Sequence, residues 1–244
     1  MTNDNLQPFG PIHPVPVVHF SLEFADAVRH LFQRVRPDAV AVELPNSLLD
    51  VVQKGVRRLP EVSVVLYQNN AGETIYLPIE PTDPFVEAIR SGLEADVPVH
   101  FVDPDLDAYP SYRDFVPDTY AAYRLGIEAY FDIYSREVLP VLKRGPADMR
   151  RETGMAYRLQ KLAAKYTKIL FVCGLAHLEG VKAAFFRPQA EPLERTKRTG
   201  VSLFNLHPDD LPEVMTEYPF LSALYEYRRH KLPPKPELSK FTVR

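Results

Sequence analysis

The 244-residue chain is poor in the features that several classes of protein require. It has one cysteine, Cys173, and therefore cannot form an internal disulfide. No apolar run approaches the roughly 18 residues that span a bilayer. The N-terminus also lacks the charged and apolar regions of a secretion signal. We therefore expect a cytoplasmic protein that does not enter a membrane.

The chain also has no excess of positive charge and few glycines. The formal net charge of -3 provides no basic face of the kind that binds nucleic acid. The ten glycines form neither a Gly-x-Gly-x-x-Gly nor a Gly-x-x-x-x-Gly-Lys phosphate loop, which disfavours a nucleotide-binding domain. The Gly-x-Ser-x-Gly elbow of many serine hydrolases is also absent.

The composition that remains is that of a globular protein, with 45% hydrophobic and 25% charged residues. We expect residues 1–207 to form one α/β domain, residues 208–232 a helical extension, and residues 233–244 a proline-rich tail. The tail is typical of a linker, which suggests that the chain is one part of a longer protein.

Short apolar runs alternate with stretches of helical periodicity, and this order predicts an α/β fold. The run at 39–43 is apolar at successive positions, as in a parallel strand covered on both faces. We expect a mostly parallel central sheet with helices on both faces and an antiparallel hairpin inserted at 62–80. The predicted strands are 14–19, 39–43, 62–68, 74–80, 97–103, 168–173 and 200–206. The predicted helices begin at Ser21, at Ser47 as a capping-box variant, at residue 85 after an N-cap at Asp83, and at residues 118, 146, 178, 209 and 220. The helix from 118 runs to 142, and a polar, tyrosine-rich loop at 104–117 precedes it.

Polar residues stand where these predicted strands end. Ligands of open α/β sheets bind outside the carboxyl ends of the strands, so these residues are the candidates for a site. They are His19, Glu43, Gln68, Glu80, Asp103 and His177.

Each candidate also has a structural interpretation. Asp103 precedes a proline and would cap a turn, Glu80 would be solvated, and His19 would be a hydrogen-bonded structural histidine. Glu43 is harder to explain in this way, because a carboxylate that closes a buried strand needs a cation or donors. His177 follows a glycine turn and precedes a helix, where its ring would face the crevice.

Two blocks of sequence resemble the TraB/Tiki/GumN superfamily, which includes erythromycin-esterase-like and ChaN-like proteins. The first runs from His19-Phe-Ser through a helix and Arg36-Pro-Asp to Ala39-Val-Ala-Val-Glu-Leu. The second contains Arg151-Glu, Met155-Ala and the Gly174-x-x-His177 motif. The matching glycine is absent at the first histidine, which reads Pro16-Val-Val-His19.

The resemblance implies an α/β fold whose histidines and glutamate share one pocket. Tiki-like members are metal-dependent peptidases, erythromycin-esterase-like members hydrolyse esters, and ChaN-like members bind haem. The leading hypothesis is therefore a metal-dependent hydrolase of peptide or ester bonds, with a peptide or a small molecule as substrate. Its metal ligands would be His19, Glu43, His177 and Asp103, with zinc, manganese or cobalt as the ion.

In this hypothesis Glu43, His177 and Glu80 are catalytic candidates, one carboxylate acts as general base, and Arg151 clamps an anion. A metal-free variant, with His177 or His19 activating water beside Glu43, requires the same residues. The alternative is a module without turnover, which binds haem, a metal or another ligand, or serves as a partner domain of a larger assembly. The oligomeric state is left open.

Overall fold

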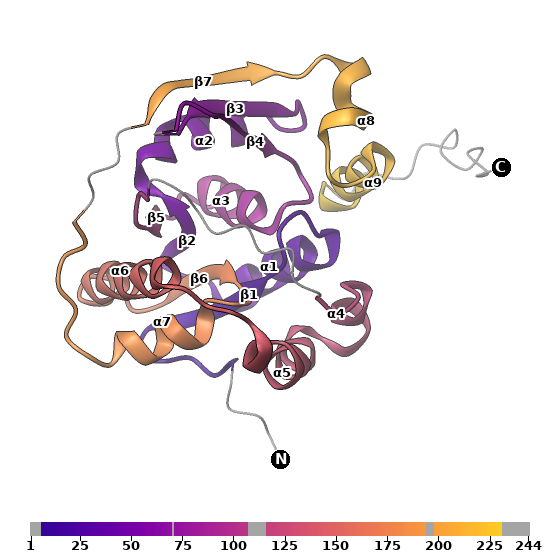
Figure 1. Ribbon diagram of the computed structural model, residues 1–244. Helices are drawn as coiled ribbons and strands as arrows, with labels where there is room; N and C mark the ends of the chain where they lie inside the picture. Colours follow the sequence, from indigo (N-terminus) through magenta and orange to yellow (C-terminus); the bar gives the residue numbers. More distant parts are fainter. Residues whose placement is uncertain (1–5, 70, 107–115, 194–197, 231–244) are drawn as a thin grey trace.

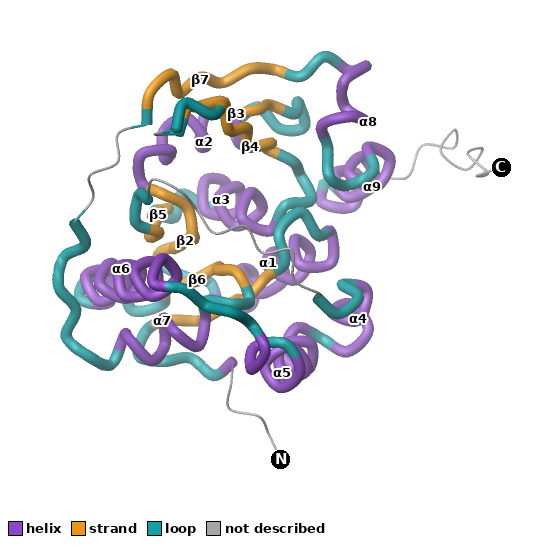
Figure 2. Tube along the Cα trace, viewed as in Figure 1, coloured by secondary structure: helices purple, strands orange, loops and turns teal. Residues whose placement is uncertain are grey.

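The computed structural model describes residues 6–69, 71–106, 116–193 and 198–230 (Figure 1). It confirms the α/β class. The strands form two groups, a four-stranded parallel sheet and a three-stranded antiparallel sheet (Figure 2). Among the described residues, no helix combines the length and the apolar character that crossing a membrane requires.

The main sheet has the order β1-β6-β2-β5, with all neighbours parallel. Its strands are β1 (Ile12–Val17), β2 (Ala39–Pro45), β5 (Val99–Asp103) and β6 (Ile169–Gly174). The apolar runs of β2 and β6 are buried on both faces, as their sequences predict. Because β6 lies between β1 and β2, segments far apart in the chain end side by side at one edge.

Helices cover both faces of this sheet (Figure 1). Helices α1 (Leu22–Val35) and α3 (Pro84–Glu94) pack together on one face, and α6 (Pro146–Ala163) packs with α7 (Leu178–Phe185) on the other. Asp83 caps α3 as the sequence predicts, since its Oδ1 accepts from the N–H groups of Phe85 and Val86 at 2.8 and 3.0 Å.

The predicted hairpin forms, but it is not part of the parallel sheet. Strands β3 (Ser63–Gln68) and β4 (Thr74–Ile79) pair with β7 (Thr199–Asn205) in the order β4-β3-β7. Helix α2 (Leu49–Val56), preceded by the 3₁₀ turn η2 (Asn46–Leu48), packs against this second sheet. Ser47 does not cap α2 as predicted, because its N–H and hydroxyl both donate to Asp105.

The prediction of one long helix over 118–142 is wrong. The segment divides into α4 (Tyr120–Leu125), α5 (Ile127–Glu137) and the 3₁₀ turn η3 (Leu139–Val141). Gly126 separates α4 from α5 with a φ of 85°, a backbone conformation that glycine adopts at little cost. Most of the predicted tyrosine-rich loop at 104–117 lies outside the described residues, as does the proline-rich tail at 233–244.

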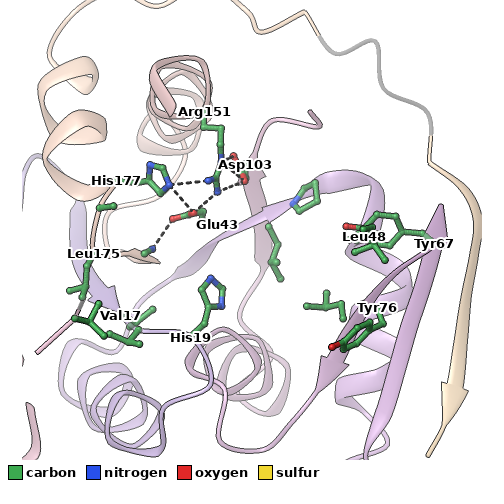
Figure 3. Close-up of a pocket in the computed structure, with 18 of the residues that line it drawn as sticks. Val17, His19, Glu43, Leu48, Tyr67, Tyr76, Asp103, Arg151, Leu175 and His177 are labelled. Carbon is green, nitrogen blue, oxygen red and sulfur yellow. Dashed lines mark hydrogen bonds and ion pairs between the residues drawn. The ribbon is translucent and has the colours of Figure 1, made fainter. Parts of the chain in front are cut away.

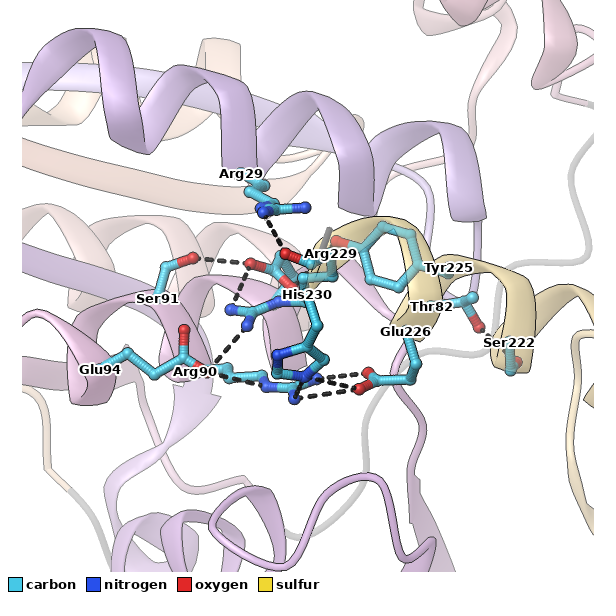
Figure 4. Close-up of polar contacts among 11 residues, drawn as sticks. Arg29, Thr82, Arg90, Ser91, Glu94, Ser222, Tyr225, Glu226, Arg229 and His230 are labelled. Carbon is cyan, nitrogen blue, oxygen red and sulfur yellow. Dashed lines mark hydrogen bonds and ion pairs between the residues drawn. The ribbon is translucent and has the colours of Figure 1, made fainter. Parts of the chain in front are cut away.

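The C-terminal extension contains the turn η4 (Pro208–Asp210), α8 (Leu211–Val214) and α9 (Pro219–Arg229). Helix α9 is fastened to α3 by buried polar contacts (Figure 4). Arg229 Nε donates to Glu87 Oε2 at 2.8 Å, and the Tyr225 hydroxyl donates to the same oxygen at 2.9 Å. Arg90 forms an ion pair with Glu226. The extension is therefore part of the folded unit.

Removing the Tyr225 hydroxyl tests this attachment. Tyr225→Phe withdraws one donor from the fully buried Glu87 carboxylate, and we expect the free energy of unfolding to fall by about 2 kcal/mol. Urea denaturation measures the change. The control is Tyr227→Phe on the same helix, because Tyr227 makes no side-chain hydrogen bond to a described residue. Equal stability of the two variants would contradict the prediction.

Candidate active site

A cavity of about 500 Å³ opens at the carboxyl ends of the four parallel strands. Each of these strands ends in or just before a residue that lines the cavity, and the helix α6 adds Arg151. The facing wall comes from the second sheet and η2. Figure 3 shows the resulting division, with charged groups on one side and Leu48, Tyr67 and Tyr76 on the other.

Arg151 is the centre of the charged side. Its Nε lies 3.1 Å from both carboxylate oxygens of Asp103, and its Nη2 donates to Asp103 Oδ2 at 2.8 Å and to Glu43 Oε1. Nη1 lies 2.9 Å from Nε2 of His177. Glu43 also accepts the Gly174 N–H at 2.7 Å, which ties β2 to β6. The guanidinium thus joins two strands and the turn that precedes α7 through buried side chains.

These contacts fix the state of His177. An Arg N–H can only donate, so Nε2 of His177 accepts and the proton is on Nδ1, 3.1 Å from Glu152 Oε1. Burial lowers the pKa of His177, and the Arg151 charge lowers it further, against the opposing effect of Glu43. At neutral pH His177 is therefore a neutral, buried ring with both nitrogens engaged.

The two carboxylates share one guanidinium, and their pKa values move in opposite directions. Burial opposes ionisation of Glu43, but the charge that His177 carries when it is protonated, the Arg151 charge and the Gly174 N–H outweigh it and hold the pKa of Glu43 below its usual value. Burial and the nearby Glu43 charge raise the pKa of Asp103 to about 6, although Arg151 acts against the shift. Because the two carboxyl groups share one cation and lie close together, the protonation of one affects the pKa of the other.

This shift predicts a pH dependence of stability. The folded-state pKa of Asp103 lies above its ordinary value of 3.8, so the folded protein binds the proton more tightly and loses stability as pH rises from about 4 to about 6. We expect Asp103→Asn to remove this loss, which is about 3 kcal/mol for a pKa raised from 3.8 to about 6. Urea denaturation of both proteins at pH 4, 5, 6 and 7 measures it, and parallel profiles would contradict the prediction.

His19 differs from His177 in exposure. Its side chain is 46% exposed and its ring points into the cavity (Figure 3), where Nε2 makes no hydrogen bond to a described residue. Nδ1 lies 3.5 Å from Asp83 Oδ2, and the Phe85 ring packs edge-on at 4.3 Å. Partial burial lowers the pKa of His19, but Asp83 and then Glu43 outweigh it, so the pKa is raised. The Asp83 carboxylate therefore favours the form of His19 with a proton on Nδ1, and Nε2 faces the cavity.

The turn after His19 is built to hold this orientation. Phe20 has a φ of 54°, a left-handed conformation that is uncommon for a residue with a side chain. Its N–H donates to the same oxygen of Asp83 at 3.1 Å. One carboxylate thus caps α3, fixes the turn and faces the His19 ring.

Five of the predicted site residues meet at this cavity, namely His19, Glu43, Asp103, Arg151 and His177. Glu80 does not line it. Strand β4 belongs to the antiparallel sheet, so its end does not converge with those of the parallel strands, and Glu80 accepts the Thr216 N–H at 2.9 Å. Gln68 is also absent from the lining, because it follows the lining residue Tyr67 on β3 and its exposed side chain points to the opposite face of the strand.

The sequence interpretation missed Asp83 and Glu152 as members of the site. Asp83 was predicted as a helix cap, and a cap also presents a second carboxylate oxygen to the residues packed beside it. Glu152 was noted beside Arg151, but a helix places neighbours about 100° apart, and the sequence alone does not show that both reach His177.

A divalent metal does not fit this arrangement of the described residues. The Arg151 guanidinium occupies the space between Glu43, Asp103 and His177, and both nitrogens of His177 are engaged. Among the residues that the structure describes, no three or more His, Cys, Asp or Glu side chains form a group that could hold a metal ion. Nor does Arg151 match the predicted anion clamp, because its donors are directed at the protein's own carboxylates and imidazole.

Fold and site together define an α/β protein with a polar cavity at the carboxyl ends of a parallel sheet. Comparison of the chain with known protein families, with curated proteins and with solved structures finds no match. The resemblance to the TraB/Tiki/GumN superfamily therefore stays a prediction.

Proposed function

We propose that the protein is a metal-independent hydrolase of ester bonds in small molecules, with His19 as the group that moves protons. The observation that carries the proposal is the His19 ring itself, half-exposed in the cavity, with Asp83 facing Nδ1 and Nε2 turned to the open space. A histidine oriented by a carboxylate is a recurrent general base.

The proposed reaction follows from this geometry. Nε2 of neutral His19 accepts a proton from a water molecule, whose oxygen attacks the ester carbonyl carbon. The tetrahedral intermediate then collapses and expels the alcohol, which takes the proton back from His19. The products are a carboxylic acid and an alcohol, and the histidine returns to its starting state.

Glu43, Arg151, Asp103 and His177 act in this proposal as one unit. The pKa of Glu43 is lowered, so its carboxylate is ionised at neutral pH and has accepting capacity left for a water in the cavity. Asp83 and Glu43 both raise the pKa of His19, which makes it a stronger base once it is neutral. Arg151 and His177 hold Glu43 in place and are positioning residues.

The saturated contacts of Arg151 favour a second candidate, a binding module without turnover. Its guanidinium meets Glu43, Asp103 and His177, and such mutual satisfaction is typical of a framework that supports a binding cavity. A haem, a metal or another small molecule would then be held without being changed.

An ester assay with metal analysis separates these candidates. The purified protein is assayed by titration of released acid with neutral methyl esters, with and without a chelator, and its metal content is measured by mass spectrometry. The proposal expects turnover that the chelator leaves unchanged. Activity that the chelator abolishes and zinc, manganese or cobalt restores would support the metal-dependent hypothesis. No turnover together with a bound haem or metal would support the binding module.

A further inference from the structure

The cavity has an apolar wall that the proposed reaction does not use. Leu48 comes from η2, and Tyr67, Ile75 and Leu77 come from the hairpin β3–β4, where Tyr67 pairs with Ile75 in register. In a strand, alternate residues share one face, so Ile75 and Leu77 present their side chains to the same side. The wall faces the charged groups across the cavity (Figure 3).

The aromatic part of this wall is held rigidly. Tyr67 is 8% exposed, and the Arg198 guanidinium lies 4.6 Å from the centre of its ring. Arg198 Nε donates to Asp105 at 2.9 Å, and Ser47 donates to the same carboxylate. The Arg198 charge is thus paired with Asp105, and it is not among the groups that line the cavity. Tyr67 offers a fixed apolar surface.

The charge of the cavity limits what it accepts. Among the described residues that line it, Arg151 is the one Lys or Arg side chain, and it is directed at Glu43 and Asp103. A substrate carboxylate or phosphate would meet carboxylates and a cation that is already paired. Burying such an anion without a partner is costly, so the charges disfavour anionic substrates.

We propose, resting on the hydrolase function above, that the cavity selects uncharged esters whose acyl group is a short aliphatic chain lying against Tyr67, Ile75 and Leu77. The carbonyl then lies beside His19 and the chain extends to the hairpin. Each methylene buried there adds about 0.8 kcal/mol of binding free energy, so kcat/KM rises roughly three- to fourfold per methylene until the wall is covered.

The test is a titrimetric series of methyl esters from acetate to decanoate, with methyl pentanoate compared against the anion of monomethyl succinate. We expect kcat/KM to rise with chain length and to be at least about tenfold higher for the neutral ester than for the anion. A flat series, or faster hydrolysis of the succinate, would overturn the inference and leave the hydrolase function standing.

Ile75→Asp places a carboxylate on the apolar wall. We expect it to lower kcat/KM for methyl hexanoate at least about tenfold, mainly through KM, and thereby to reduce the preference for methyl hexanoate over methyl acetate. Thr74→Asp is the matched control, because Thr74 is the exposed neighbour of Ile75 and does not line the cavity. Equal losses in the two variants would overturn the inference.

A binding measurement keeps the inference testable without turnover. Calorimetric titration with butanamide, hexanamide and hexanoate uses ligands that the enzyme does not need to convert. If hexanamide binds more tightly than the other two ligands, and Ile75→Asp removes this difference, the apolar wall is supported. This holds even if no ester is hydrolysed, and in that case the hydrolase function alone fails. Absence of both hydrolysis and binding overturns both.

Discussion

Replacing His19 with alanine is expected to lower kcat/KM for a neutral methyl ester by about 10²- to 10⁴-fold, the usual contribution of a general base. The reason is that His19 is the lining imidazole whose Nε2 remains available to a water, whereas both nitrogens of His177 are engaged. Initial rates at several ester concentrations, followed by titration of released acid, measure the change. His19→Gln, which keeps a polar side chain without a base, should show the same loss.

The matched control is His30→Ala. His30 lies on the exposed face of α1 with its side chain 69% exposed, so its removal alters one histidine without touching the cavity. Because His19 is itself half-exposed, its alanine variant should retain the circular dichroism spectrum and nearly all of the stability of the wild type. A folded His19→Ala protein with wild-type kcat/KM would refute the assigned role.

The pH dependence of the rate gives a sharper version of the same result. A general base works in its neutral form, so kcat/KM should rise with pH through the pKa of His19, which Asp83 raises above its ordinary value of 6.5. Asp83→Asn removes that charge and should move the rising limb to lower pH. If the rise of kcat/KM with pH stays at the same pH in a folded Asp83→Asn protein, the titrating group is not His19.

Much of the main sheet could be predicted, because a strand that is buried on both faces has a nearly continuous run of apolar residues. The runs that became β2 and β6 contain little but apolar residues, and the sheet places their carboxyl ends together whatever the strand order. This is why Glu43 and His177 could be selected from sequence. Glu80 was selected by the same rule and lies elsewhere, because an apolar run does not say to which sheet it belongs.

The state of each site residue could not be read from sequence. Which histidine is buried and neutral depends on where Arg151 lies, and that depends on how α6 packs over β5, a contact between residues about fifty positions apart. The role of Asp83 likewise requires α3 to bring its N-terminus beside the turn at Phe20. Such long-range packing is decided by the whole core, and no local pattern records it.

Arg151→Ala is expected to have the largest effect on stability. It leaves Glu43 and Asp103, whose side chains are 4% and 2% exposed, facing each other without their cation. Breaking a buried ion pair on one side usually costs about 3 to 5 kcal/mol, so we expect the free energy of unfolding to fall by about that amount at pH 7. Urea denaturation measures it, with Arg150→Ala, an exposed neighbour on α6, as the matched control.

The origin of that loss of stability can be checked by removing the carboxylates that Arg151→Ala leaves without a cation. If uncompensated carboxylates cause it, the triple variant Arg151→Met, Glu43→Gln, Asp103→Asn should recover a large part of the lost stability, because no buried charge is then left alone. Lowering the pH should narrow the gap between Arg151→Ala and the wild type, since protonated carboxyl groups need no cation. An Arg151→Ala protein as stable at pH 7 as Arg150→Ala would mean that Glu43 and Asp103 find another cation or water, and that the guanidinium does not hold this cavity together.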